Sequence, residues 1–212
     1  MAKATPRRTQ EERSAHTRGR LIQAALDELM VQGYAGLTTS AIADRAQVSR
    51  GALTHHFASK EDLVVQAVEH MLHEATAEIR TLADSVAARR LPLDDFLDRL
   101  WEMFRGRLLL VTLEHVTAAR HNPSLKARLV PVVREFHGAL DSIWREFFRA
   151  AGLPAEEVET SLNATLCLLR GMGVQTVLRE DPAYYAGLLA WWKAELRKLM
   201  RPPASSPRIR VL

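Results

Sequence analysis

Prolines placed at the starts of helices constrain this chain more than any other feature of its sequence. At the first position of a helix, proline loses no hydrogen bond and its fixed φ is already helical. The prolines predict helices that begin near residues 92, 123, 154 and 182, with Asn122 and Asp181 as candidate N-caps of two of them and a bend at Pro131. Between these starts apolar residues recur at steps of three and four, and no stretch alternates as a half-buried strand does. The sequence therefore predicts an all-α fold.

The composition limits the class of protein. The 212 residues are 47% hydrophobic and 25% charged with ten Gly and nine Pro, which excludes collagen-like and low-complexity chains. No apolar run reaches the roughly 18 residues that a membrane helix needs, and residues 1–10 are basic with no apolar core behind them, unlike a signal peptide. A single cysteine, Cys167, excludes an intrachain disulfide. We therefore expect a cytoplasmic protein with no membrane partner.

The positive charge is confined to the first part of the chain. Residues 1–60 hold nine Lys or Arg against five Asp or Glu, whereas the remaining residues balance at twenty of each. A small basic segment joined to a neutral body suggests a polyanion such as DNA as the partner of that segment. The alternative is an ordinary solvated surface, because a net charge of +4 is weak evidence alone.

Two short helices joined by a tight turn form the strongest local pattern. After a helix over residues 13–32 that ends at Gly33, Thr38 or Thr39 can cap a two-turn helix. A turn at Gln47 follows, and Ser49 can cap a second helix over residues 50–57. In such a pair the second helix enters the major groove, where Arg50 in its first turn is placed to read a guanine edge.

At residues 18–68 the chain resembles the tetracycline-repressor (TetR) family of bacterial regulators. The resemblance is strongest in LTTSAIADRAQVSRGALTHHFASKEDL, residues 37–63, followed by a long helix from Lys60. It implies a homodimer in which an N-terminal three-helix DNA-binding domain joins a helical domain for dimerisation and for a small-molecule effector of unknown identity. By position, the resemblance assigns Ser40, Arg50, Gly51 and Ala52 to the DNA groove, and Thr39, Thr54, His55, His56 and Lys60 to phosphates or adjacent bases.

Two departures from the family pattern fall in the same segment. Gln47 stands where the family has glycine, so a side chain there takes a positive φ at a cost of roughly 1 kcal/mol. Thr54 stands where a tyrosine contacts phosphate, which shortens or removes that contact. We include Gln47 among the candidate DNA-binding residues. The alternative for these residues is a solvated surface on a three-helix domain that binds protein.

The patterns divide the chain into four segments: a flexible basic arm (1–12), the helix-turn-helix domain (13–60), the effector-binding and dimerisation domain (61–200) and a flexible tail (201–212). Two helices of the third segment carry apolar seams at alternating steps of three and four, which predict a four-helix dimer interface. The interface residues are Leu162, Leu169, Met172, Thr176, Leu189, Trp192 and Leu196. The alternative is that both seams pack on the rest of the same chain.

Two stretches, 108–116 and 162–178, are apolar nearly all round and are expected to be central, yet each carries charge. A buried charge must be paired or used. Glu114 and Arg170 either form a structural pair or line an effector cavity. The candidate cavity residues are Trp101, Phe104, Thr112, Glu114, His115, Cys167 and Arg170. Cys167 by itself reads more simply as a small core residue.

No pattern of catalytic residues or cofactor ligands stands out. His70 and His73 lie three residues apart with Glu69 and Glu74 beside them, which is a weak metal signal, and no hydrolase, dinucleotide or P-loop motif is present. We expect no metal, no cofactor and no enzymatic activity. The favoured function is a dimeric repressor of a pseudo-palindromic double-stranded DNA operator, released by an effector. The alternative is a helical-bundle metalloenzyme or carrier whose basic segment docks to a partner.

Overall fold

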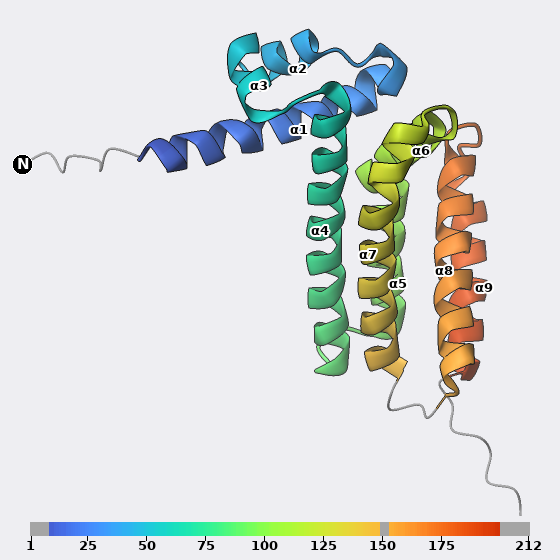
Figure 1. Cartoon of the computed structure of the whole chain (residues 1–212). Coiled ribbons are helices and arrows are strands. Elements are labelled where there is room, and N and C mark those ends of the chain that lie inside the picture. The colour runs from blue at the N-terminus through green and yellow to red at the C-terminus, as the bar shows by residue number, and fades with distance from the viewer. Residues whose placement is uncertain (1–8, 149–152, 200–212) are drawn as a thin grey trace, which may run out of the picture. The chain divides into compact units, whose positions relative to one another are not determined.

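The computed structural model describes residues 9–148 and 153–199, and within these ranges it contains nine helices and no strand (Figure 1). The helices are α1 (Gln10–Gly36), α2 (Thr39–Arg45), α3 (Arg50–His56), α4 (Lys60–Ala87), α5 (Leu93–Arg105), α6 (Arg107–His121), α7 (Pro123–Phe148), α8 (Ala155–Thr176) and α9 (Pro182–Leu199). The predicted all-α class is confirmed. No helix among these residues is long and apolar enough to cross a membrane.

The helix starts follow the prolines. Pro123 and Pro182 are the first residues of α7 and α9, while Pro92 and Pro154 stand one position earlier, as N-caps with extended backbone. The predicted side-chain caps are present: Asn122 Oδ1 accepts a hydrogen bond from Leu125 N at 3.0 Å, and Asp181 Oδ1 accepts one from Tyr184 N at 3.0 Å. The residues around each proline therefore determine where these four helices begin.

The first helix differs from its prediction at both ends. It begins at Gln10 because Thr9 and Glu12 form a capping box, in which each side chain accepts a hydrogen bond from the other's backbone N–H. Residues 10–12 are therefore helical and not part of a flexible arm. Gly33 has a positive φ of 65°, as predicted, but its ψ of 173° is extended, and α1 continues to Gly36 beyond the kink. The predicted tail, 201–212, lies outside the described residues.

The chain forms two compact units, which do not follow the linear boundary predicted at residue 60. The first unit contains α1, α2, α3, the start of α4 to residue 75, α6, and α7 to residue 136. Here α1 packs on α2, α3 and α6 (Figure 1). Its core is built from fully buried side chains of four helices: Leu21, Leu26, Leu29, Ile42, Leu53 and Leu63.

The second unit contains the rest of α4, α5, the rest of α7, α8 and α9. α5, α8 and α9 pack on one another and run side by side (Figure 1). Phe96 and Trp144 form part of its aromatic core, and Trp144 Nε1 donates to Ser161 Oγ at 2.9 Å. The apolar stretches 108–116 and 162–178 are less central than predicted, because Val116 of α6 is 57% exposed and Leu178, just past the end of α8, is 95% exposed.

Candidate functional site

Local hydrogen bonds build the helix-turn-helix. Thr38 Oγ1 accepts from Ala41 N at 3.1 Å and so caps α2, while Ser49 Oγ accepts from Ala52 N at 3.1 Å and caps α3. Between them Gln47 has the predicted positive φ, at 52°. The turn closes through Gln47 N to Asp44 O and Val48 N to Ala43 O, both 3.0 Å long. The structure thus confirms the spacing and the caps predicted from sequence.

One face of α3 is in the core and the other is exposed. Leu53 and Phe57 are buried, whereas Arg50, Gly51, Thr54 and His55 are exposed. Of the other predicted DNA contacts, Thr39 and Gln47 are exposed, and Ser40, Ala52 and His56 are half-buried. Burial and the neighbouring positive charges of His55 and Arg18 lower the pKa of His56. These nine positions all reach the surface of the first unit, and their contacts to DNA stay a prediction.

Several basic side chains of the first sixty residues brace the protein itself. Arg20 donates to the backbone oxygens of Ala46 and Gln47 in the turn, and Arg45 pairs with the buried Glu28. Arg18 hydrogen-bonds to Gln66 and lies over the Phe57 ring, 5.8 Å from its centroid. Sequence reasoning missed these roles, because nothing local marks a partner 17 to 48 residues away.

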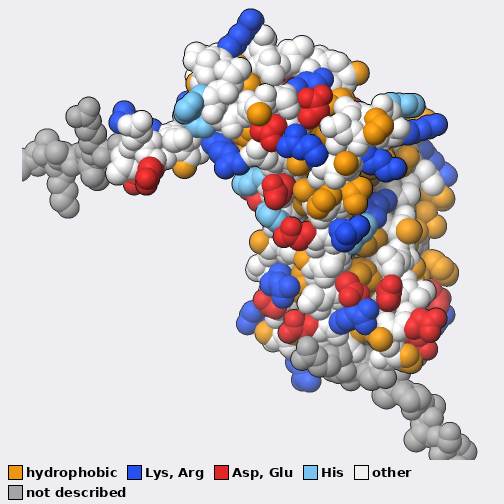
Figure 2. Space-filling view, viewed as in Figure 1, with side chains coloured by type: hydrophobic (Ala, Val, Ile, Leu, Met, Phe, Trp, Pro, Cys, Tyr) orange, Lys and Arg blue, Asp and Glu red, His pale blue; other side chains and the backbone are white. Residues whose placement is uncertain are grey.

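Arg50 differs from these three arginines. It is exposed in the first turn of α3, and no hydrogen bond or ion pair engages its guanidinium among residues 9–148 and 153–199. Figure 2 shows Lys, Arg and His side chains on the visible face of this unit, with acidic side chains among them. Net charge therefore overstates what is available to a polyanion, and Arg50 is the arginine of α3 that has no such partner among the described residues.

Lys60 requires a correction. It was expected to meet phosphate, but its Nζ donates to the backbone oxygens of Tyr34 and Leu37, both at 3.3 Å, and lies 4.5 Å from the centroid of the Tyr34 ring. Lys60 thus holds the chain between α1 and α2 against the start of α4. At that start Ser59 Oγ accepts from Asp62 N at 3.0 Å, which confirms Ser59 as a helix cap.

Two side chains of α6 fix this helix to α1. Arg107 donates to Gln23 Oε1 at 3.1 Å and to Asp27 Oδ1 at 3.0 Å. Further along α6, Glu114 Oε2 accepts a hydrogen bond from Tyr34 N at 2.8 Å. Glu114 therefore serves the backbone beside the Gly33 kink, and the predicted pairing with Arg170 is not its role.

The seven predicted effector residues are divided between the two units. Thr112, Glu114 and His115 belong to the first unit, and Trp101, Phe104, Cys167 and Arg170 to the second. Thr112 donates to Leu108 O at 2.6 Å. His115 is 3% exposed, and burial lowers its pKa to about 4. Cys167 is exposed, so its expected place in the core is wrong.

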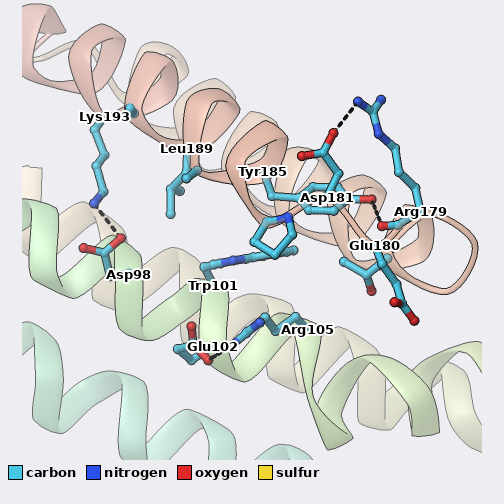
Figure 3. Close-up of a pocket in the computed structure, with 14 residues that line it drawn as sticks. Asp98, Trp101, Glu102, Arg105, Arg179, Glu180, Asp181, Tyr185, Leu189 and Lys193 are labelled. Atoms are coloured by element: carbon cyan, nitrogen blue, oxygen red, sulfur yellow. Dashed lines mark hydrogen bonds and ion pairs between the residues drawn. The ribbon is translucent and has the colours of Figure 1, made fainter.

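A groove of about 700 Å³ lies between α5 and the beginning of α9 (Figure 3). Trp101 and Tyr185 lie on its apolar side with ring centroids 5.8 Å apart. Six of the charged side chains around it form ion pairs: Lys193 with Asp98 at 2.6 Å, Arg105 with Glu102 at 2.7 Å, and Arg179 with Asp181 at 2.8 Å. Glu180 also lines the groove and forms no ion pair among the described residues. The groove therefore offers a ligand apolar contacts and one unpaired carboxylate.

A second, apolar cavity lies within the same unit and has free space of about 10 Å³. Phe104, Leu140, Trp144 and Leu166 are among the residues that line it. Phe104 also lies under the guanidinium of Arg170, 5.9 Å from the ring centroid. Among the seven predicted effector residues, Phe104 and Arg170 are thus brought together.

The predicted dimer seam requires a second correction. Its apolar members Leu162, Leu169, Met172, Leu189 and Leu196 are buried inside this chain, and Thr176 and Trp192 are half-buried. Trp192 Nε1 donates to Thr165 Oγ1 of the same chain at 2.9 Å. The alternating steps of three and four therefore mark packing of α8 and α9 on their own unit, because periodicity identifies a buried stripe and not what buries it.

The two histidines of the weak metal signal have acidic neighbours. His70 Nε2 lies 3.2 Å from Glu74 Oε1, and His73 Nε2 lies 3.3 Å from Glu135 Oε1. Across the described part of the chain, no group of three or more His, Cys, Asp or Glu is placed to hold a metal ion.

Comparison with known proteins places this fold and its helix-turn-helix in a family. The family described as "Bacterial regulatory proteins, tetR family" matches residues 21–67. The transcriptional regulator CymR of Pseudomonas putida is 29% identical over 175 residues, covering 82% of this chain and 86% of the relative. An uncharacterized HTH-type transcriptional regulator of Mycobacterium tuberculosis is 30% identical over 180 residues, covering 82% and 92%.

Solved structures share the fold. A TetR-family regulator from Mesorhizobium loti superposes with a TM-score of 0.71 at 18% identity, over 89% of this chain and 96% of that one. The regulator FadR from Bacillus subtilis, solved in complex with stearoyl-CoA, gives 0.62 at 19% identity, over 86% and 97%. The chain belongs to the TetR family of bacterial transcriptional regulators. It is a DNA-binding regulator and not an enzyme.

Proposed function

We propose that this regulator is a repressor that binds a pseudo-palindromic operator in the cytoplasm as a homodimer and leaves it when a small molecule binds. The observation that carries the DNA-binding part is the contrast between Arg50 and its neighbours. Arg18, Arg20 and Arg45 are engaged within the protein, whereas Arg50 projects from the first turn of α3 without a partner among the described residues. A guanidinium in that position reads the O6 and N7 edge of guanine in the major groove.

Because the seams are buried inside the chain, the proposed dimer interface is the face of α8 and α9 that the chain leaves uncovered. Val174 of α8 and Trp191 of α9 are 46% and 58% exposed, and Leu178, in the connection between the two helices, is almost fully exposed. Gly171 and Gly187 have open space where a Cβ would stand, so a partner helix could approach their backbone closely. Figure 2 shows hydrophobic side chains along the edge formed by α8 and α9. A two-fold dimer carries two copies of α3, one for each half-site of a pseudo-palindromic operator.

Release by a small molecule is supported by the second unit, whose apolar cavity and groove both lie outside the helix-turn-helix. A relative of the same fold, FadR, is solved in complex with stearoyl-CoA. A ligand that prefers a conformation unfit for DNA would weaken operator affinity by its differential affinity for the two conformations.

Selection of bound genomic DNA fragments tests the proposal and yields the operator. We expect a two-fold symmetric consensus whose half-sites are separated by whole helical turns, with steep salt dependence of the affinity. Arg50→Ala should cost about 1–3 kcal/mol per half-site and relax the base preference at one position. The control is Arg99→Ala, which removes an exposed arginine of α5 and should leave the consensus and affinity unchanged. An unchanged consensus for Arg50→Ala would refute the assignment of base reading to Arg50.

A further inference from the structure

Arg170 carries a positive charge that no acidic group balances. This α8 side chain is half-buried, its Nη2 lies 3.0 Å from His137 Nε2 on α7, and its guanidinium lies over the Phe104 ring of α5. Among the residues that the structure describes, no Asp or Glu forms an ion pair with it. Other arginines of the same unit, such as Arg105, Arg145 and Arg179, each have a carboxylate partner. Arg170 is therefore a cation of the second unit that has no acidic partner among the described residues.

His137 does not supply that counter-charge. Burial and the adjacent Arg170 both lower the pKa of His137, so its surroundings favour the uncharged imidazole. Burial also lowers the pKa of the Arg170 guanidinium, which nevertheless remains a cation in the physiological range. Since Arg170 is donor-only, the Nε2 atom facing it acts as the acceptor. This leaves the remaining N–H groups of the guanidinium available to an anion.

The unbalanced cation lies one helical turn beyond a residue that lines the apolar cavity. Leu166 and Leu140 line that cavity, and Arg170 and His137 are their neighbours one helical turn along α8 and α7. Phe104 belongs to both places, because it lines the cavity and carries the guanidinium over its ring. An apolar space lined by α4, α5, α7 and α8 thus has one positive charge beside it, which is the arrangement that recognises a molecule with an apolar body and a single negative end.

We propose that Arg170, with His137 and Phe104 beside it, is the polar end of an effector site for a slim organic monocarboxylate whose apolar body enters the cavity next to Phe104. This inference rests on the proposed release by a small molecule and names the class of that molecule. One cation and an apolar lining, with Thr165 as its polar member, favour a monoanion over a phosphate dianion or a sugar.

The small size of the cavity gives this ligand a way to act. Free space of about 10 Å³ holds no more than one water, so a ligand must separate the helices that line the cavity, α4, α5, α7 and α8, to enter. The ligand consequently binds an opened conformation better than the closed one. That difference in affinity is what shifts a regulator between two states.

The test measures binding to the full-length protein without DNA, by calorimetry, for octanoate and 4-phenylbutyrate and for the matched neutral amides octanamide and 4-phenylbutyramide. At least one acid should bind, and its amide about 10- to 100-fold more weakly, because the charge-assisted hydrogen bonds are lost. Arg170→Met should weaken that acid by a similar factor and leave the amide unchanged. Arg99→Met, an exposed arginine on α5, is the matched control and should bind like the wild type.

Arg170→Lys keeps the cation, and should bind the acid with intermediate affinity if Arg170→Met fails to fold. Equal binding of acid and amide, unchanged acid affinity in Arg170→Met, or no acid binding below about 1 mM would overturn the carboxylate site. Operator affinity of ligand-free Arg170→Met separates the two hypotheses. Retained operator binding together with lost acid binding supports the site, whereas an acid that binds through Arg170 without releasing operator supports the site and contradicts release by that ligand.

Discussion

The carboxylate of Glu114 accepts a hydrogen bond from the backbone N–H of Tyr34, at 2.8 Å, and so joins residues 80 positions apart. Tyr34 is also held from its other side, since Lys60 Nζ donates to its carbonyl oxygen and lies over its ring. Glu114 is on α6, and Lys60 begins α4, the helix that follows α3 along the chain. The segment that leads into α2 is therefore fixed by two helices that do not themselves belong to the helix-turn-helix.

Gly33, next to Tyr34, should not tolerate a side chain. Its φ of 65° disfavours any L-residue, and a Cβ there would lie 2.7 Å from Glu114 Oε2. We expect Gly33→Ala to lower the free energy of unfolding by about 1–3 kcal/mol, measured by urea denaturation. The control is Gly19→Ala, at an exposed helical position with nothing near the new Cβ, which should raise it by about 0.5–1 kcal/mol.

A double-mutant cycle separates the clash at Gly33 from its backbone strain. Glu114→Ala removes the carboxylate that a Cβ would meet, at the cost of an acceptor for Tyr34 N. The double variant should therefore be more stable than the sum of the single effects implies, by about 0.5–3 kcal/mol. Strict additivity would show that Glu114 does not approach Gly33 as described.

Lys60 should affect stability and not the number of phosphate contacts. Its ammonium is engaged with the Tyr34 and Leu37 carbonyls, so we expect Lys60→Ala to lower the free energy of unfolding by about 1 kcal/mol. The slope of log affinity for operator against log salt concentration should stay that of the wild type, as it should in the exposed control Lys126→Ala. A slope reduced by about 0.9 in Lys60→Ala would instead identify a phosphate contact.

His115 should make the protein less stable in mild acid. Its folded pKa of about 4 lies below the ordinary 6.5 because burial penalises the charged imidazolium. For a histidine with a lowered pKa, the neutral form that the fold requires is fully present above pH 6.5. Its contribution is lost as pH falls from about 6.5 toward 4, because the unfolded chain binds the proton first.

Between pH 7 and pH 5 this single group should remove about 2 kcal/mol of unfolding free energy. Urea denaturation at the two pH values measures the loss, and His115→Leu, which keeps an apolar side chain in the buried position, should show a loss smaller by that amount. The exposed His121 at the end of α6 provides the control, since His121→Leu should keep the wild-type pH dependence. Equal losses in the wild type and His115→Leu would contradict the buried neutral state.

Features of the fold that depend on residues close together in the sequence could be predicted, and the helix-turn-helix is one of them. Thr38, Ser49 and Gln47 act on atoms within a few positions of themselves, so the caps and the left-handed turn were predictable. Glu114 and Lys60 act over 80 and 26 positions, and their residue types alone do not specify backbone partners. Sequence reasoning consequently predicts a phosphate contact for Lys60 and an ion pair or cavity position for Glu114, whereas in the structure both residues join helices.

The prediction of the dimer interface was wrong for a different reason. Leu169 and Leu189 were correctly expected to be buried, but a helical stripe contains no information on whether its own chain or a second copy covers it. Arg170 shows the complementary case. The sequence marked it as a charge within an apolar stretch, and only the packing of the helices shows that a histidine and a phenylalanine lie beside it.

Exposed residues of α8, α9 and the connection between them can be replaced by charged residues without burying charge inside the single chain. Leu178 and Trp191 are 95% and 58% exposed, so charge placed there adds no buried charge to the single chain. If this face holds two copies together, Leu178→Glu combined with Trp191→Glu buries charge between them and should give folded monomers in sedimentation. The affinity for a two-fold operator should fall steeply, because each monomer then binds one half-site.

Two variants test this face against the alternatives. Val31→Glu places the same charge at a 67% exposed position of α1 and should leave a dimer, whereas Leu169→Glu places it at a fully buried position and should unfold the chain. Circular dichroism of each variant establishes that it is folded before sedimentation is interpreted. A folded Leu178→Glu, Trp191→Glu protein that remains dimeric would refute this interface, since two carboxylates on each copy could not then lie between the subunits.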